Sequence, residues 1–334
     1  MGAGILLLGL VLLAFAGSAY WSERRRRPTG TPAPGHRSEI NLPHQAEWEV
    51  YHNPLSLCSK KLRFCMDELG LAYTGHEVEL IETGAYENIR PAFLRVNPGG
   101  TVPVLVHQGH PIYESHEQIV YAAQHAGEMG QRLLGASPEG RAAVSQWVDF
   151  GALKGNPLDG GPDRAGDSVP ALTFPLFAAM LPSIPWFRIV EGLLFHADRR
   201  RPLLFMVLKL RGLKGLPSPL LKTLKKAREN MAGHLDHLEA TLADGRSWVC
   251  GDQLTLADVS WVAILERLEE ADWMDVYFGD GRRPAVVRYV ERYRARPSYG
   301  TALSSRGAIQ VKALEDIQRA KAESTALRKK LEGR

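Results

Sequence analysis

The pattern of apolar and polar residues divides the chain into three regions. Residues 3–21 form one continuous apolar run without a charged side chain. From residue 47 to about 128, short apolar runs of four or five residues alternate with turn residues, which is typical of strands and connecting helices. Beyond residue 137, apolar positions recur every three to four residues, which indicates helices. We therefore expect an apolar N-terminal helix, an α/β domain and an all-helical domain.

The N-terminal run has the properties of a membrane anchor. An apolar stretch of about 20 residues is long enough to span a bilayer. Tyr20 and Trp21 stand at its end, and four arginines, Arg24–Arg27, follow almost at once. This arrangement predicts a single-pass helix with the folded domains on the cytosolic side. The alternative is a secretory signal cleaved near residues 14–16, but a signal carries its positive charge before the apolar run.

The elements expected after the anchor give an order typical of a thioredoxin-like domain. A strand at Trp48–Tyr51 precedes a helix at Ser56–Leu69, which Gly70 ends. A strand at His76–Leu80 and a short helix at Pro91–Arg95 follow. A hairpin and a further helix then complete a βαβ, helix, ββα order.

The hairpin region, Asn97–Ser115, carries the most specific pattern in the chain. Val102-Pro103 stands at a strand entrance, where proline has no N–H to donate to the sheet. A cis bond there would leave the Val102 backbone free to pair with a bound peptide. After the hairpin, Glu114-Ser115 opens a helix with Ser115 as the expected N-cap, and a helix N-terminus attracts carboxylates. Together these features suit a short anionic peptide, although an ordinary hairpin with a proline turn fits the same spacing.

The helical region begins near Ser137 and contains an unusual segment. Helical periodicity at 138–150, 220–242 and 284–295 is interrupted by residues 155–219, which are rich in Pro and Gly and contain apolar bursts. Thr255 to Asp258 forms a capping-box variant that starts a buried helix. The predicted boundaries are an anchor at 1–22, a flexible basic and Pro-rich linker at 23–46, a thioredoxin-like domain at 47–128, an all-helical domain at 129–305 with an insertion at about 155–219, and a charged helical tail at 306–334.

These motifs identify a family resemblance. Asn97 to Leu105, followed by Glu114-Ser115, resembles the glutathione-binding half of the glutathione transferase superfamily. The resemblance implies a cis-proline at Pro103, a peptide-pairing backbone at Val102 and a γ-glutamyl site at Glu114 and Ser115. It also implies the transferase fold, an α/β thioredoxin-like domain followed by an all-α domain, with glutathione as co-substrate.

A narrower resemblance concerns the second half of the chain. Residues 248–260, residues 277–284 and the long insertion are similar to the ganglioside-induced differentiation-associated subgroup of the superfamily. That subgroup consists of membrane-anchored relatives of the transferases, for which catalysis is not an established property. This chain departs from the subgroup by carrying its anchor at the N-terminus and by keeping Glu114-Ser115.

Glutathione transfer requires a thiolate at neutral pH, although a free thiol has a pKa of about 8.5. A hydroxyl donor at the start of the first helix can stabilise the thiolate, and Ser56 is the first candidate because it matches the catalytic serine of the serine-using classes. Ser56 could instead serve only as a helix cap. Cys58 is the second candidate, for thiol exchange. Cys58 shares a helical face with apolar residues, however, which favours a small buried core residue.

Composition and charge limit the other classes of function. The 334 residues are 45% hydrophobic with a net charge of +4, so the chain can bury a sizeable core and lacks a global nucleic-acid signature. Three cysteines without CxxC spacing favour a reducing compartment. The histidines form no metal-binding spacing, and we predict no metal. From Asp198 to Glu229, ten Lys or Arg stand against two acids, which is typical of a membrane-surface segment or a solvated helix face.

The sequence thus predicts a membrane-anchored glutathione transferase that conjugates glutathione to an apolar electrophile bound between its domains. Two alternatives stay open, a catalytically weak scaffold or sensor at a membrane and a thiol transferase that uses Cys58. The expected partners are glutathione, the electrophile, the lipid bilayer and a second copy in a homodimer, with no nucleic acid.

Overall fold

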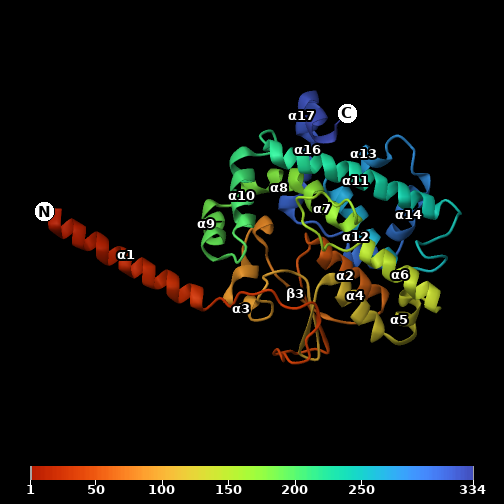
Figure 1. Ribbon diagram of the computed structural model, residues 1–334, viewed down its shortest axis with the longest axis horizontal. Helices are drawn as coiled ribbons and strands as arrows, with labels where there is room; N and C mark the ends of the chain where they lie inside the picture. The colour runs from red at the N-terminus through yellow and green to blue at the C-terminus, as the bar shows by residue number, and fades with distance from the viewer. Residues whose placement is uncertain (1, 334) are drawn as a thin grey trace.

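In a computed structural model that describes residues 2–333, the chain folds into an α/β domain and a helical domain, preceded by a projecting helix (Figure 1). The α/β domain contains a five-stranded sheet in the order β1-β5-β4-β2-β3. Only β2 and β3 are parallel, and the other neighbours are antiparallel. The strands are β1 (Gly35–His36), β2 (Trp48–His52), β3 (Thr74–Glu77), β4 (Val104–His107) and β5 (His110–Tyr113). The predicted thioredoxin-like domain is confirmed.

The segment predicted as a flexible linker is partly ordered into the sheet. Within residues 23–46, β1 pairs with β5 and extends the edge that β5 would otherwise leave free. Leu42 packs in a small core with Val104 and Tyr113. The prediction for this segment was wrong because a two-residue strand is too short to show an alternating pattern.

Two helices of the α/β domain position the candidate site. Helix α2 (Leu57–Glu68) begins after Ser56, whose side chain accepts a hydrogen bond from the backbone N–H of Ser59 at 3.3 Å. Gly70 follows the helix with φ +66°, a conformation that favours glycine. Helix α4 (Ser115–Gln124) starts one residue earlier than expected, so Glu114 occupies the N-cap position and Ser115 lies in the first turn.

The remaining chain is helical, and the insertion predicted only as apolar bursts also forms helices, α7 to α10. The short helices of the first half are α3 (Pro91–Leu94), α5 (Gly127–Leu134), η1 (Ile81–Thr83) and η2 (Glu87–Ile89). The helical domain contains α6 (Pro138–Phe150), α7 (Ala165–Leu172), α8 (Phe174–Met180), η3 (Leu181–Ser183), α9 (Trp186–Phe195), α10 (Arg200–Arg211), α11 (Ser218–Leu242), α12 (Leu256–Glu270), α13 (Met274–Phe278), α14 (Pro284–Arg294), α15 (Pro297–Ala302), α16 (Ala308–Glu323) and α17 (Thr325–Glu332).

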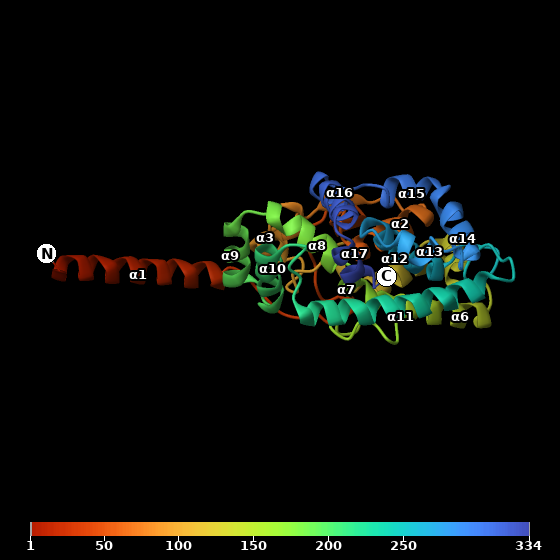
Figure 2. The ribbon, with the colours of Figure 1, turned by 90° about the horizontal axis from the view of Figure 1, so that it is seen from above.

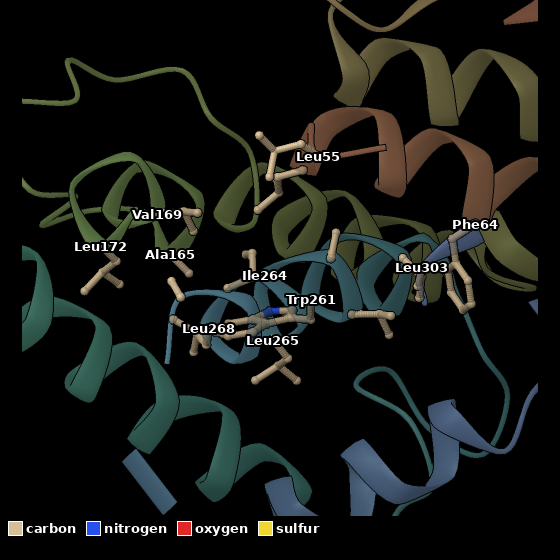
Figure 3. Close-up of a cluster of buried hydrophobic side chains, with 14 of the residues drawn as sticks. Leu55, Phe64, Ala165, Val169, Leu172, Trp261, Ile264, Leu265, Leu268 and Leu303 are labelled. Atoms are coloured by element: carbon tan, nitrogen blue, oxygen red, sulfur yellow. The ribbon is translucent and has the colours of Figure 1, made fainter. Parts of the chain in front are cut away.

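Helix α12 lies at the centre of the main core. Its capping box is present as predicted, with Asp258 accepting a hydrogen bond from the Thr255 N–H at 2.8 Å. Figure 3 shows Trp261, Ile264 and other side chains of α12 among residues from α7 and from the α2 region. Helix α12 therefore joins the insertion to the α/β domain through one continuous apolar cluster.

A buried ion pair also holds the two domains together. The Lys60 Nζ on α2 lies 2.5 Å from Oε1 of Glu270 on α12, and both side chains are fully buried. Glu270 also accepts a hydrogen bond from Arg267 at 2.8 Å, and Arg267 donates to the backbone carbonyl of Leu55. Because these groups bridge α2 and α12, they fix the relative position of the two domains.

Helix α1 (Gly2–Arg25) extends away from both domains (Figures 1 and 2). Within the described residues, Ile5–Arg25 is the one continuous helix that is long and apolar enough to cross a membrane. A bent pair made by 165–183 and 186–195 passes the same test together, but its first part is buried in the main core.

Candidate functional site

Two adjoining cavities lie between the α/β domain and the helical domain. The smaller has a volume of about 360 Å³ and the larger about 810 Å³. Both are lined by Ser56, Cys58, Leu80, Leu153 and Arg201. A molecule in the smaller cavity therefore lies directly beside a molecule in the larger one.

All of the site residues predicted from the sequence line the smaller cavity. These residues are Ser56, Cys58, Val102, Pro103, Glu114 and Ser115. They come from the start of α2, the entrance to β4 and the start of α4. The sheet brings these three points together because β4 lies between β2 and β5.

The Val102-Pro103 bond is cis, as predicted. The Ser56 Oγ donates a hydrogen bond to the Val102 carbonyl at 3.4 Å. The Gln118 amide on α4 donates to the carbonyls of Pro103 at 2.9 Å and Ile112 at 2.8 Å. These bonds connect the loop before β4 to both helices of the site.

Glu114 and Ser115 form the opposite wall of the smaller cavity. Glu114 has φ +69°, an uncommon conformation for a residue with a side chain, and such conformations are often found at functional sites. Desolvation, reinforced by the charge of Glu117, raises the pKa of the Glu114 carboxyl. Ser115 is buried at the start of α4, where the first backbone N–H groups lack partners within the helix. This wall thus offers a carboxylate for a cation beside a hydroxyl and a helix N-terminus for an anion.

Cys58 does not lie where the sequence suggested. We expected a small buried core residue, but Cys58 is half-buried and lines both cavities. Cys58 lies in the first turn of α2 and also packs against the main core, whereas Cys65, two turns later, is fully buried. Cys65 is a core residue as predicted, and its burial raises the pKa of the thiol.

The larger cavity is predominantly apolar and is built mainly by the insertion. Apolar residues lining it include Leu55, Leu57, Leu80, Leu153, Val169, Phe174, Phe177, Leu203, Leu204, Phe205, Val207 and Leu220. Leu55 and Val169 also belong to the core cluster of Figure 3, so the main core supports this wall. The cavity matches the apolar pocket expected between the domains, and the insertion forms much of its lining.

Arg201 is a charged residue lining both cavities that the sequence reasoning did not predict. Its guanidinium lies 2.8 Å from Oε1 of the buried Glu82 and adjoins both cavities. The sequence pattern counted Arg201 only as one of ten basic residues in a surface segment. No local motif reveals that Arg201 lines the cavities, because Glu82, the residue with which it pairs, lies more than a hundred residues earlier in the chain.

Comparison with known proteins identifies the family. The model of the glutathione S-transferase N-terminal domain matches residues 55–125, and that of the C-terminal domain matches residues 180–292. The chain belongs to the glutathione transferase superfamily. The two matches include the start of α2, the cis-proline loop, the start of α4 and α12.

Several relatives of this transferase-superfamily chain span most of its length. A tetrachloro-p-hydroquinone reductive dehalogenase from Sphingobium chlorophenolicum is 26% identical, covering 77% of this chain and 95% of the relative. The human ganglioside-induced differentiation-associated protein 1-like 1 is 27% identical, covering 86% of this chain and 81% of the relative. The β-etherase LigF from Sphingobium has the same fold, with a TM-score of 0.62, 20% identity, and coverage of 77% of this chain and 98% of the enzyme.

Proposed function

We propose that this protein is a membrane-anchored glutathione transferase that conjugates glutathione to an apolar electrophile. One observation carries the proposal: the predicted glutathione-binding residues line one cavity that shares a wall with a larger apolar cavity. The smaller cavity would hold glutathione, and the larger would hold the acceptor. Ser56 and Cys58 stand at the boundary between them.

Glutathione fits the charges of the smaller cavity. Its cysteinyl backbone would pair with the main chain of Val102, as an added strand pairs with a sheet edge. Its γ-glutamyl carboxylate would bind Ser115 and the N-terminus of α4. Its α-amino group would lie against Glu114, because a partly desolvated carboxylate gains from an adjacent cation.

Ser56 is the proposed activator of the thiol. Its hydroxyl lies at the N-terminus of α2 and, by turning its proton from the Val102 carbonyl, can donate a hydrogen bond to a sulfur whose negative charge the helix also stabilises. The glutathione thiolate would attack the electrophilic carbon and form a C–S bond. The bond to the leaving group would break, the leaving group would depart with the electron pair, and the thiol proton would pass to solvent.

Thiol transfer through Cys58 is the second candidate, favoured by the exposure of Cys58 to both cavities. The Cys58 thiolate would attack a glutathionylated substrate, releasing its thiol and forming a protein–glutathione disulfide. A second glutathione would then reduce that disulfide and leave as oxidised glutathione. The relative named as a reductive dehalogenase is consistent with redox chemistry within the superfamily.

Matched variants distinguish the two reactions. Conjugation to 1-chloro-2,4-dinitrobenzene should fall roughly 10- to 100-fold in Ser56→Ala, with a higher apparent pKa for the bound thiol, and persist in Cys58→Ala. The opposite pattern, together with glutathione-dependent disulfide reduction lost in Cys58→Ala, would assign thiol transfer. Glutathione binding without either activity would identify a scaffold or sensor.

The membrane anchor is proposed from α1, whose exposed apolar surface ends in an aromatic pair and four arginines. We expect the full chain to remain in the membrane fraction after carbonate extraction, because a spanning helix is not held by charge. A protease added to the cytosolic side should cleave the folded domains. A soluble protein with a new N-terminus near residues 16–19 would instead identify a cleaved signal.

A further inference from the structure

We propose that α9 and α10 lie on the surface of the lipid bilayer and that the larger cavity receives substrates dissolved in the membrane. The inference rests on the proposed anchoring of α1 and on the proposed transferase activity, and it names the substrate class. It concerns the insertion, whose basic residues suggest from the sequence alone either a membrane-surface segment or a solvated helix face, with no link to the cavity.

Helix α9 exposes an apolar face where a water-exposed helix would carry polar residues. Trp186 is 48% exposed, Val190 49% and Leu194 42%, and these residues lie four positions apart on one face. Phe187 beside them is 61% exposed. The inward side of α9 is also apolar and includes the buried Ile189. A helix that is apolar on both sides requires an apolar environment on its outer side as well.

The contacts of α1 place this face at the level of the bilayer surface. The rings of Tyr20 and Phe195 stack with their centroids 5.7 Å apart. Arg24 donates to the carbonyl of Leu194 at 3.4 Å, and Arg199 donates to the Tyr20 hydroxyl at 3.4 Å. The end of α9 therefore meets α1 where its apolar run gives way to arginines. In Figures 1 and 2, α9 runs crosswise to α1 at the end of the body from which α1 leaves.

The charges around the apolar face suit anionic headgroups. Arg199, Arg211 and Lys214 are exposed on α10 and its flanks, and the charged residues of α9, Arg188 and Glu191, pair with each other at 2.8 Å. The ammonium of Lys209 lies 5.1 Å from the centroid of the Trp186 ring. An apolar helix face bordered by cations is typical of helices that lie in the membrane interface. A lipid surface therefore fits this patch in both its apolar and its charged parts.

The same helices form part of the larger cavity. Leu203 on α10 lines the cavity and is 46% exposed, and Leu158 on the facing loop lines it and is 56% exposed. The rim of the cavity thus has apolar side chains in contact with the surroundings. With α9 and α10 on the bilayer, the Leu203 side of that rim lies on a helix in contact with the lipid, and we infer that apolar molecules enter the cavity from this side. The expected acceptors are electrophiles with long alkyl chains that partition into membranes.

Tryptophan quenching in the full chain tests the position of α9. The protein is reconstituted into vesicles that contain lipids brominated near the headgroup, and the quenching lost on each Trp→Phe substitution is measured. Trp186→Phe should remove a distinct part of the quenching, as should Trp21→Phe, whereas Trp147→Phe on the distant α6 should remove none (Figure 2). Loss with Trp21→Phe but not with Trp186→Phe would overturn this inference and leave the anchor in place. If neither Trp21→Phe nor Trp186→Phe reduces the quenching, the anchor is contradicted as well.

A pair of substrates tests the route into the cavity. Phe187→Glu places a charge on the outer face of α9, at an exposed position outside both cavities. In vesicles, conjugation of a long-chain 1-bromoalkane, which loses bromide, should fall about tenfold, while conjugation of its short-chain, more water-soluble analogue stays unchanged. If Phe187→Glu conjugates each of the two substrates at the same rate as the native protein, the membrane route is overturned. If the apolar face instead binds a second copy, quenching at Trp186 is absent and Phe187→Glu converts a dimer to a monomer.

Discussion

The two cavities of this protein are built in different ways, although they share a wall. The smaller is the more polar of the two, and its predicted ligand contacts come from Ser56 to Ser115, within one α/β domain. The larger is apolar, and much of its lining comes from α7, α8 and α10 of the insertion. The first depends on backbone groups and helix ends, whereas the second depends on side-chain volume. We infer that the chemistry is fixed by the α/β domain and that the choice of acceptor is set by the insertion.

The largest expected effect comes from breaking the buried Lys60–Glu270 ion pair, which fixes the relative position of the two domains and so of the two cavities. Lys60→Met leaves Glu270 charged and buried without its lysine, which should reduce the free energy of unfolding by about 3–5 kcal/mol. Lys225→Met, which removes an exposed lysine from an i,i+4 pair, is the control and should cost less than about 1 kcal/mol. Denaturant unfolding measures both. Equal effects would show that the ion pair does not hold the domains together.

Removing a hydroxyl from the smaller cavity should weaken the binding of glutathione without changing the binding of the acceptor. Ser115→Ala removes a hydrogen bond to the γ-glutamyl carboxylate and should weaken glutathione binding by roughly 1.5–3 kcal/mol, or about tenfold or more. The binding of an apolar acceptor should stay the same, because Ser115 lies outside the larger cavity. Ser145→Ala on the exposed side of α6 is the matched control. Unchanged glutathione affinity in Ser115→Ala would mean that the carboxylate binds elsewhere.

Acid should destabilise the α/β domain at a histidine next to the smaller cavity. Burial, with the charges of Lys154 and Lys61, lowers the pKa of His116 to about 4. As the pH falls from about 6.5 to 4, the unfolded chain binds a proton at this position before the folded chain does, so stability is lost. His116→Gln should remove about 1–2 kcal/mol of that loss. Unfolding measured at pH 7 and pH 4.5 compares the variants, and an unchanged pH dependence would exclude His116 as the cause.

The smallest effect is expected in the wall of the larger cavity. Val207→Thr keeps the shape of the side chain but adds a hydroxyl, so it should weaken binding of an apolar acceptor by about 1 kcal/mol. The affinity for glutathione should not change, because Val207 does not line the smaller cavity. Fluorescence titration with an apolar dye and equilibrium dialysis with glutathione measure the two affinities. If Val207→Thr weakens the binding of both the apolar dye and glutathione, the two cavities do not bind their ligands independently.

The sequence predicted the polar cavity better than the apolar one for physical reasons. Pro103, Glu114 and Ser115 are recognisable because proline and helix-start residues impose local backbone geometry. The ion pair between Arg201 and Glu82 and the exposure of Cys58 depend on how distant helices pack, which no local pattern reports. The formation of strand β1 within residues 23–46 likewise depends on its pairing with β5. Side-chain volume in an insertion leaves only an apolar signal, so the sequence predicted an apolar pocket between the domains but not that the insertion forms much of its lining.

The central claim is that the smaller cavity binds glutathione as a thiolate beside Ser56. Isothermal titration calorimetry of the full chain in nanodiscs tests it most directly, since truncation near residue 43 would remove β1. We expect binding at one site per chain, with a heat that depends on the ionisation enthalpy of the buffer because the thiol releases its proton. Ser56→Ala should retain binding but lose the buffer dependence. An absence of glutathione binding, or binding that is unchanged in Ser115→Ala and independent of buffer, would contradict the account.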